Sequence, residues 1–169
     1  YKSKNLSNVL GVSTILEFKP VTLEQKELFE SYMSNPMYRG SECAFSNLFV
    51  WRDCYNIYWC VAHGFLLIKV KRDNVDFFLP PIGGADEDLP LVLAELREFS
   101  QGKPFEMHGI YEMTKERLAK VLPDAEFIED RDNWDYIYLR EKLATLSGRK
   151  YHGQKNHYNS FKKNYPDYV

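Results

Sequence analysis

Apolar and polar positions over residues 22–52 follow a helical period. A capping box formed by Thr22 and Gln25 predicts the start of a helix, because a hydroxyl and an amide three residues apart satisfy exposed backbone N–H groups. Its expected apolar face is Leu28, Phe29, Tyr32 and Met33, and Asn35-Pro36 predicts its end. A second helix is expected over residues 41–52, with Ser41 as N-cap and a buried stripe of Ala44, Phe45, Leu48 and Phe49. A short strand is expected before both helices, at residues 15–18.

The middle of the chain has a strand-like pattern. Residues 55–62, 65–71 and 75–79 are rich in β-branched and aromatic side chains. His63-Gly64 is typical of a two-residue hairpin turn, and Arg72-Asp73-Asn74 predicts a second turn. We therefore expect three consecutive antiparallel strands.

Helical and strand-like segments alternate after this meander. The strongest helix prediction begins at Asp88, with Pro90 in its first turn, Gly102 at its end, and an apolar face of Leu89, Val92, Leu93, Leu96 and Phe99. We next expect a strand over residues 104–108. A helix follows over residues 114–122, with Leu118, Val121 and Leu122 directed inward. Two further strands are expected, at residues 127–128 and 134–140. This order predicts an α+β fold: a mixed, mostly antiparallel sheet with helices on both faces.

The C-terminal segment is basic. Residues 142–166 contain no acidic residue and six basic ones, and Tyr158, Phe161 and Tyr165 recur at helical spacing, so a basic amphipathic helix is expected. Two interpretations stay open. The helix binds a polyanion such as RNA through Arg149, Lys150, Lys155, Lys162 and Lys163, or it is a solvated face that docks on nearby acidic surface.

Composition and targeting features indicate a cytoplasmic protein. The formal net charge is −2, and no apolar stretch approaches the roughly 20 residues of a membrane span. The three cysteines form no C-x-x-C pair, which favours reduced thiols. Residues 1–13 lack the hydrophobic region of a signal peptide and are expected to be disordered or tag-like.

No sequence motif identifies a catalytic residue or a metal site. His152 and His157 are five residues apart, which is not the spacing that puts two imidazoles on one metal from one helix face. Gly83-Gly84, just before the helix at Asp88, has two interpretations. It holds a pyrophosphate through backbone N–H groups, or it is a turn that needs glycine's conformational freedom. Three acidic residues, Asp86, Glu87 and Asp88, oppose an anion there.

Several stretches carry a resemblance to a known family. They are FKPVT (18–22), FSNLFVWR (45–52), FFLPPIG (77–83), EDRDNWDYIYL (129–139), LSGRKYHG (146–153) and residues 156–166, which end in FKKNYP. The element order and the glycine loop are similar to the GNAT N-acetyltransferase superfamily. More specifically, the chain resembles a bacterial family of uncharacterised proteins related to the C-terminal domain of phosphatidylglycerol lysyltransferase.

This resemblance implies two GNAT-like domains in tandem, comparable to Fem-type aminoacyltransferases. Residues 14–146 would form the first domain, and residues 147–169 the basic helix that leads toward the second. Pro80 stands where CoA-binding members carry Arg or Gln, which implies that Gly83 and Gly84 belong to a degenerate loop that holds no CoA.

The sequence therefore leaves two alternative functions open. One is the non-catalytic N-terminal half of an acyl- or aminoacyl-transferase, whose donor, acyl-CoA or aminoacyl-tRNA, is bound only with the second domain. The other is a non-enzymatic scaffolding domain that contacts RNA or another polyanion. The expected partners are the second domain, tRNA, and a second copy through the exposed face of the last helix, without membrane insertion.

Overall fold

The computed structural model describes residues 16–38, 40–72, 75–101, 103 and 105–168. The chain divides after Asn133 into two compact units, residues 1–133 and 134–169, and each is described by itself. The predicted domain boundary between residues 146 and 147 falls inside the second unit and stays a prediction.

The first unit is a mixed α+β fold around one six-stranded sheet. Its neighbouring strands follow the order β1-β2-β3-β4-β6, and β5 also pairs with β3. All pairs are antiparallel except β4 and β6. The strands are β1 (Lys19–Pro20), β2 (Tyr58–Ala62), β3 (Phe65–Arg72), β4 (Val75–Phe78), β5 (Ile82–Gly83) and β6 (Glu106–Met107). The predicted α+β class with a mostly antiparallel sheet is confirmed.

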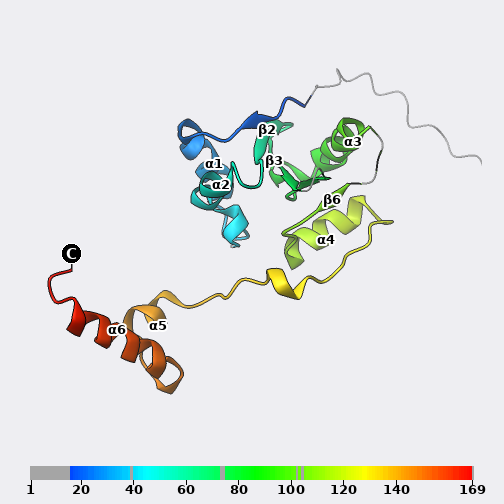
Figure 1. The fold of residues 1–169 in the computed structure, drawn as a ribbon. Coiled ribbons are helices and arrows are strands. Elements are labelled where there is room, and N and C mark those ends of the chain that lie inside the picture. The colour runs from blue at the N-terminus through cyan, green and yellow to red at the C-terminus, as the bar shows by residue number, and fades with distance from the viewer. Residues whose placement is uncertain (1–15, 39, 73–74, 102, 104, 169) are drawn as a thin grey trace, which may run out of the picture. The chain divides into compact units, whose positions relative to one another are not determined.

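Helices cover both faces of this sheet (Figure 1). The α-helices of the first unit are α1 (Lys26–Met33), α2 (Phe45–Trp51), α3 (Leu89–Phe99) and α4 (Glu112–Val121). Four short 3-10 turns accompany them: η1 (Leu23–Gln25), η2 (Ser41–Cys43), η3 (Asp86–Asp88) and η4 (Arg131–Asn133).

Strand β3 supplies the core on both faces, because successive side chains of a strand point to opposite sides. Phe65 and Leu67 belong to one apolar cluster, which α3 and α4 complete with Val92, Leu93, Leu96 and Leu118. Leu66, Ile68 and Val70 belong to a second cluster, which α1 and α2 complete with Phe29, Met33, Phe45 and Leu48. These five residues of β3 are at most 6% exposed.

Lys69 is the polar residue within this buried run of β3. Its ammonium group lies over the rings of Tyr58, Phe18 and Phe99 at 5.2, 5.5 and 5.4 Å, and 3.8 Å from Asp76 Oδ2. Aromatic faces attract a cation, so the lysine stem packs on the sheet while its charge is held by rings and a carboxylate.

The predicted hairpin turn at His63-Gly64 and the capping box at Thr22 are confirmed, whereas Asp73-Asn74 of the second predicted turn lie outside the described residues. His63 and Gly64 both have positive φ, 48° and 76°, as a tight hairpin turn between β2 and β3 requires. The Thr22 N–H donates a hydrogen bond of 2.8 Å to Gln25 Oε1, which is the expected capping box. The predicted apolar face of α1 is correct for Phe29 and Met33 but wrong for Leu28, which is 37% exposed.

Two N-terminal predictions need correction. The first strand lies at Lys19–Pro20 rather than at residues 15–18; of the described part of that range, Leu16 and Phe18 pack on the core instead. Ser41 does not cap a long helix, because η2 ends in an extended Ala44 and α2 begins at Phe45. The helical register restarts at Ala44, and Phe45 and Leu48 are buried as a result.

The region around α3 matches its prediction more closely. Asp88 is the N-cap residue and Pro90 lies in the first turn, while Leu89, Val92, Leu93 and Leu96 are buried and Phe99 is 37% exposed. Gly102, the predicted end, lies outside the described residues. The loop before α3 contains an unpredicted strand, β5, whose Ile82 pairs with Leu66 of β3.

The last two predicted strands are wrong. Neither residues 127–128 nor residues 134–140 pair with another strand in the described part of the chain. Tyr136 and Ile137 are 82% and 75% exposed. A strand exists only where a neighbour accepts its backbone hydrogen bonds, and apolar alternation alone supplies no neighbour.

The second unit contains the predicted basic helix. Its elements are α5 (Arg140–Thr145), the 3-10 turn η5 (Arg149–Tyr151) and α6 (His152–Asn164). Tyr151 is its one buried side chain among the described residues. None of the helices described in either unit has the length and apolar character that crossing a membrane requires.

We expect the double-faced burial of β3 to dominate stability. Leu67→Ala should lower the free energy of unfolding by about 2–5 kcal/mol, because it leaves a cavity in the core. Urea denaturation measures this difference. Val61→Ala on β2 is the control, since Val61 is 42% exposed, and equal effects of the two variants would contradict the expectation.

Candidate functional site

A small cavity lies at the carboxyl ends of the two parallel strands. Leu79 and Pro80 follow β4, Gly109 and Tyr111 follow β6, and the cavity is completed by Tyr38, Glu42, Cys43, Ile82 and Thr114. Ligands of open sheets with parallel strands bind outside such carboxyl ends, which makes this place the candidate site. The cavity measures about 10 Å³ and has room for about one water molecule.

A tyrosine–carboxylate pair forms the polar centre of this site. The Tyr111 hydroxyl, at the start of α4, donates a hydrogen bond of 2.5 Å to Glu42 Oε1 on η2. This hydrogen bond links the start of α4 to η2 across the cavity.

Two glycines make room for the pair. A Cβ on Gly40 would lie 1.5 Å from the Tyr111 hydroxyl oxygen, and a Cβ on Gly109 would lie 2.8 Å from Glu42 Oε1. The spacing is the same in both segments, Gly40-x-Glu42 and Gly109-x-Tyr111. Sequence reasoning missed both groups, because they are 69 positions apart and no local pattern marks them.

The thiol next to the pair is held in its protonated form. Burial, and then the negative charge of Glu42, raise the pKa of Cys43 to about 12. Since the thiolate is the nucleophile, Cys43 is unsuited to covalent catalysis at neutral pH. Cys60 in the core is similar, because burial and the charge of Glu95 raise its pKa to about 12.

The Gly83-Gly84 loop is held by hydrogen bonds to the Gly83 N–H and to the carbonyl oxygens of both glycines. The Gly83 N–H donates to the Tyr38 hydroxyl at 2.9 Å. The Arg117 guanidinium donates to the carbonyl oxygens of Gly83 at 3.2 Å and Gly84 at 3.4 Å, and its Nε lies 2.5 Å from Asp86 Oδ1. The loop therefore presents carbonyls and a carboxylate around Arg117, and its Gly83 N–H is directed inward.

Conformation and packing account for both glycines. Their φ angles are +82° and +63°, a region that favours glycine. A Cβ on Gly84 would lie 2.3 Å from the Phe65 ring, and a Cβ on Gly83 would lie 2.8 Å from the Tyr32 ring. A turn that needs glycine explains this loop without a ligand.

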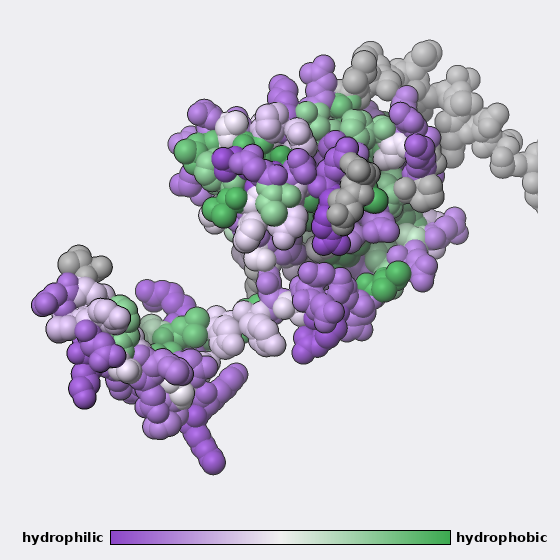
Figure 2. Space-filling view, viewed as in Figure 1, coloured by the Kyte–Doolittle hydropathy of each residue, from purple (hydrophilic) through white to green (hydrophobic). Residues whose placement is uncertain are grey.

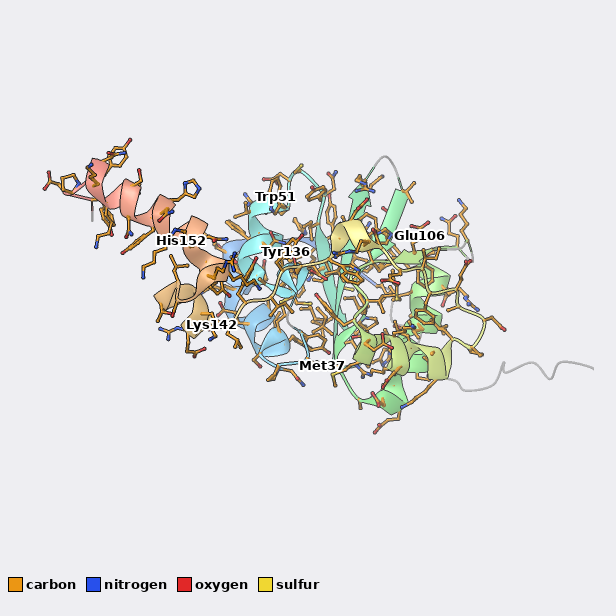
Figure 3. All side chains as sticks on the ribbon, turned by 90° about the horizontal axis from the view of Figure 1, so that it is seen from below. Met37, Trp51, Glu106, Tyr136, Lys142 and His152 are labelled. Carbon is orange, nitrogen blue, oxygen red and sulfur yellow. The ribbon has the colours of Figure 1, made fainter. Side chains whose placement is uncertain are left out.

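The five predicted polyanion-binding residues all lie in the second unit, and all are exposed. Arg149 and Lys150 belong to η5, whereas Lys155, Lys162 and Lys163 lie on α6. The Lys162 ammonium group lies 5.5 Å from the Tyr158 ring centroid, so charge and an aromatic face are adjacent. Hydrophilic and hydrophobic residues are intermixed on this unit (Figure 2), and Figure 3 labels Lys142 on α5 and His152 at the start of α6.

Within the described residues, no three His, Cys, Asp or Glu side chains gather closely enough to hold a metal ion. His63 instead contacts Glu95 Oε1 at 2.9 Å, and His108 contacts Glu106 Oε2 at 2.9 Å. His152 and His157, at the start and middle of α6, are exposed.

We expect Gly84→Ala to destabilise the first unit, because its Cβ would overlap the Phe65 ring in a strained backbone conformation. A loss of about 1–3 kcal/mol is expected from overpacking and positive φ together, measured by urea denaturation. Gly153→Ala on α6 is the matched control, since nothing lies within 4 Å of the added Cβ. A Gly84→Ala variant as stable as this control would contradict the packing argument.

Thiol reactivity tests the protonated state of the buried cysteines. At pH 8 a thiol with a pKa of about 12 stays protonated, so iodoacetamide should modify exposed Cys54 and spare Cys43 and Cys60. Mass spectrometry should show one adduct on the folded protein and three after unfolding. Cys54→Ser should remove the single native adduct, whereas rapid modification of Cys43 would show that its site is open.

Comparisons with known proteins place this arrangement in a family. The family model described as "Phosphatidylglycerol lysyltransferase, C-terminal" matches residues 37–169. A solved structure, a conserved protein of unknown function from Bacteroides thetaiotaomicron VPI-5482, is 34% identical and has a TM-score of 0.78. The similarity covers 90% of this chain and 52% of that one, so the chain spans about half the relative's length.

No curated protein matches the sequence significantly. The family match nevertheless extends over most of the first unit and all of the second, which includes Glu42, Tyr111, the glycine loop and the basic helix. The resemblance seen in the sequence is thereby confirmed: the chain belongs to the phosphatidylglycerol lysyltransferase C-terminal family.

Proposed function

We propose that this chain is the non-catalytic N-terminal half of an acyl- or aminoacyl-transferase built from two GNAT-like domains. Family membership supports a transferase-related role. The similar Bacteroides protein is about twice as long as the matched region, which agrees with a second domain beside the one formed here. In this proposal the protein works in the cytoplasm, and the second domain binds the acyl-CoA or aminoacyl-tRNA donor.

The observation that carries the proposal is that the Gly83 N–H and the carbonyls of the glycine loop are bonded within the protein. Anion binding at a helix start requires backbone N–H groups that point toward the ligand. Here the Gly83 N–H is bonded to Tyr38, and Arg117 is bonded to both glycine carbonyls and to Asp86. Opening this loop for a pyrophosphate would break these contacts and bring the phosphates toward three acidic residues, Asp86, Glu87 and Asp88.

The size of the cavity supports the same conclusion. Acyl transfer requires that donor and acceptor are held together in one site. The cavity at the ends of β4 and β6, of about 10 Å³, accommodates neither, whereas ligand sites measure roughly 300–1,000 Å³. A second, more open hollow of about 410 Å³ lies beside α1 and α2, and its lining, which includes Lys26, Glu30 and Cys43, contains no residue of the glycine loop. The Tyr111–Glu42 pair then serves to join α4 to η2 and to keep the carboxyl ends of β4 and β6 closed.

Calorimetric titration tests this proposal. We expect no heat when acetyl-CoA is added to this chain, and donor binding only when a second domain is present. Glu42→Gln should leave transfer by the two-domain protein unchanged. Tight binding of acetyl-CoA to the 169-residue chain, or loss of transfer in Glu42→Gln with donor affinity intact, would each overturn the non-catalytic role.

Polyanion binding by the second unit is the second candidate. Its residues 134–169 include seven basic and three acidic residues, while the remainder of the chain has a net charge of −6. Tyr158 and Phe161 are 48% and 45% exposed on α6, next to Lys155 and Lys162. Aromatic faces that stack on bases beside lysines that contact phosphates are typical of single-stranded RNA binding.

Charge reversal separates this candidate from a solvated helix face. Lys155→Glu combined with Lys162→Glu should abolish binding of tRNA, in fluorescence anisotropy at several salt concentrations, if α6 contacts phosphates. The matched control is Lys19→Glu with Lys120→Glu, which changes net charge equally on exposed positions of the first unit. Equal tRNA affinity of both double variants would exclude α6 as the binding surface.

A further inference from the structure

The parallel pair of strands in the first unit stops pairing at Pro80. Strands β4 and β6 are parallel, and the His108 N–H donates a hydrogen bond of 2.9 Å to the Phe78 carbonyl oxygen. A parallel ladder uses alternate residues of each strand, so residue 80 would be the next donor on the β4 side, but proline has no N–H. In the described part of the chain, no backbone hydrogen bond joins residues 79–80 to residues 109–110. The cavity at these carboxyl ends lies where Pro80 interrupts the ladder.

Thr114 is the buried polar side chain of this cavity. It lies in the first turn of α4, is 5% exposed and belongs to the cavity lining. No hydrogen bond joins its hydroxyl to any other described residue. Buried hydroxyls in folded proteins nearly always have a partner, which is either a protein group or an ordered water. The Thr114 hydroxyl therefore needs a partner from within the cavity.

Two further polar groups line the cavity beside Thr114. The Tyr38 hydroxyl oxygen accepts a hydrogen bond of 2.9 Å from the Gly83 N–H, while its own proton reaches no acceptor among the described residues. The Glu42 carboxylate accepts from Tyr111 through Oε1, and a carboxylate has lone pairs for further donors. The lining thus offers one donor, one acceptor and one hydroxyl that is able to act as either.

We propose that this cavity binds one water molecule, held by the hydroxyls of Tyr38 and Thr114 and by the carboxylate of Glu42. A cavity of about 10 Å³ has room for about one water, and a buried water makes about three hydrogen bonds. The water joins η2 and α4 at the place where Pro80 prevents a direct backbone bond between the segments that follow β4 and β6. The site lies within the first unit and does not depend on the transferase proposal.

The open hollow beside α1 and α2 gives water a route to this site. Cys43 lines both the hollow, of about 410 Å³, and the cavity, so one side chain is common to the two. Exchange of the bound water past this side chain is therefore expected without unfolding of the first unit.

A high-resolution crystal structure of the 169-residue chain tests the water site directly. We expect electron density for one ordered water in the cavity. Thr114→Val keeps the shape of the side chain but removes the hydroxyl, so the density should disappear and the midpoint of urea denaturation should fall. Thr114→Ser is the matched variant, because it keeps the hydroxyl and should therefore keep the water.

A dry cavity predicts the opposite effect on stability. Replacing a buried hydroxyl that has no partner by a methyl group removes an uncompensated polar group, so Thr114→Val would then leave the urea midpoint unchanged or raise it. That result, or a cavity without density in the unmodified chain, would overturn the proposal. Water density that persists in Thr114→Val would overturn the assignment of Thr114 as a partner of the water.

Discussion

The whole first unit depends on burying one strand from both sides. Phe65, Leu66 and Ile68 are fully buried, and alternation along β3 directs them to opposite faces. Both helical layers are needed to bury β3. Loss of α1 and α2, or of α3 and α4, would expose one complete face of the strand. The burial of apolar surface on each side is worth roughly 25 cal/mol per Å² removed from water. Two layers of helices are thus coupled through a single element.

The same strand explains why the glycine loop is shaped as it is. The edge of the Phe65 ring occupies the volume where a Gly84 side chain would stand, and Arg117 lies 5.2 Å from the centre of that ring. The guanidinium is therefore held between an aromatic face and the loop carbonyls. Packing of the core thus sets the loop conformation. In this conformation the Gly83 N–H is bonded to Tyr38 and is not available to an anion.

Sequence patterns predicted the elements whose determinants are local. The Thr22–Gln25 box, the His63-Gly64 turn and the start of α3 at Asp88 depend on residues that are close in sequence. The segment 134–140 shows the limit of such patterns, because its alternation predicted a strand but no described strand pairs with it. The Glu42–Tyr111 pair shows it too, since the two residues are 69 positions apart and meet only when β4 and β6 are parallel neighbours.

Lys69 has a consequence for how the sheet assembles. It follows Phe65 and Leu67 on one face of β3, where three aromatic rings and Asp76 receive its charge. A slip of β3 by one residue would move the lysine to the opposite face, among Phe29, Phe45 and Leu48. Among those three side chains the ammonium group would have the rings of Phe29 and Phe45 but no carboxylate in place of Asp76, so part of its desolvation would be uncompensated. Since the apolar residues of β3 would be buried in either alignment, this single charge distinguishes the correct strand register from its nearest competitor.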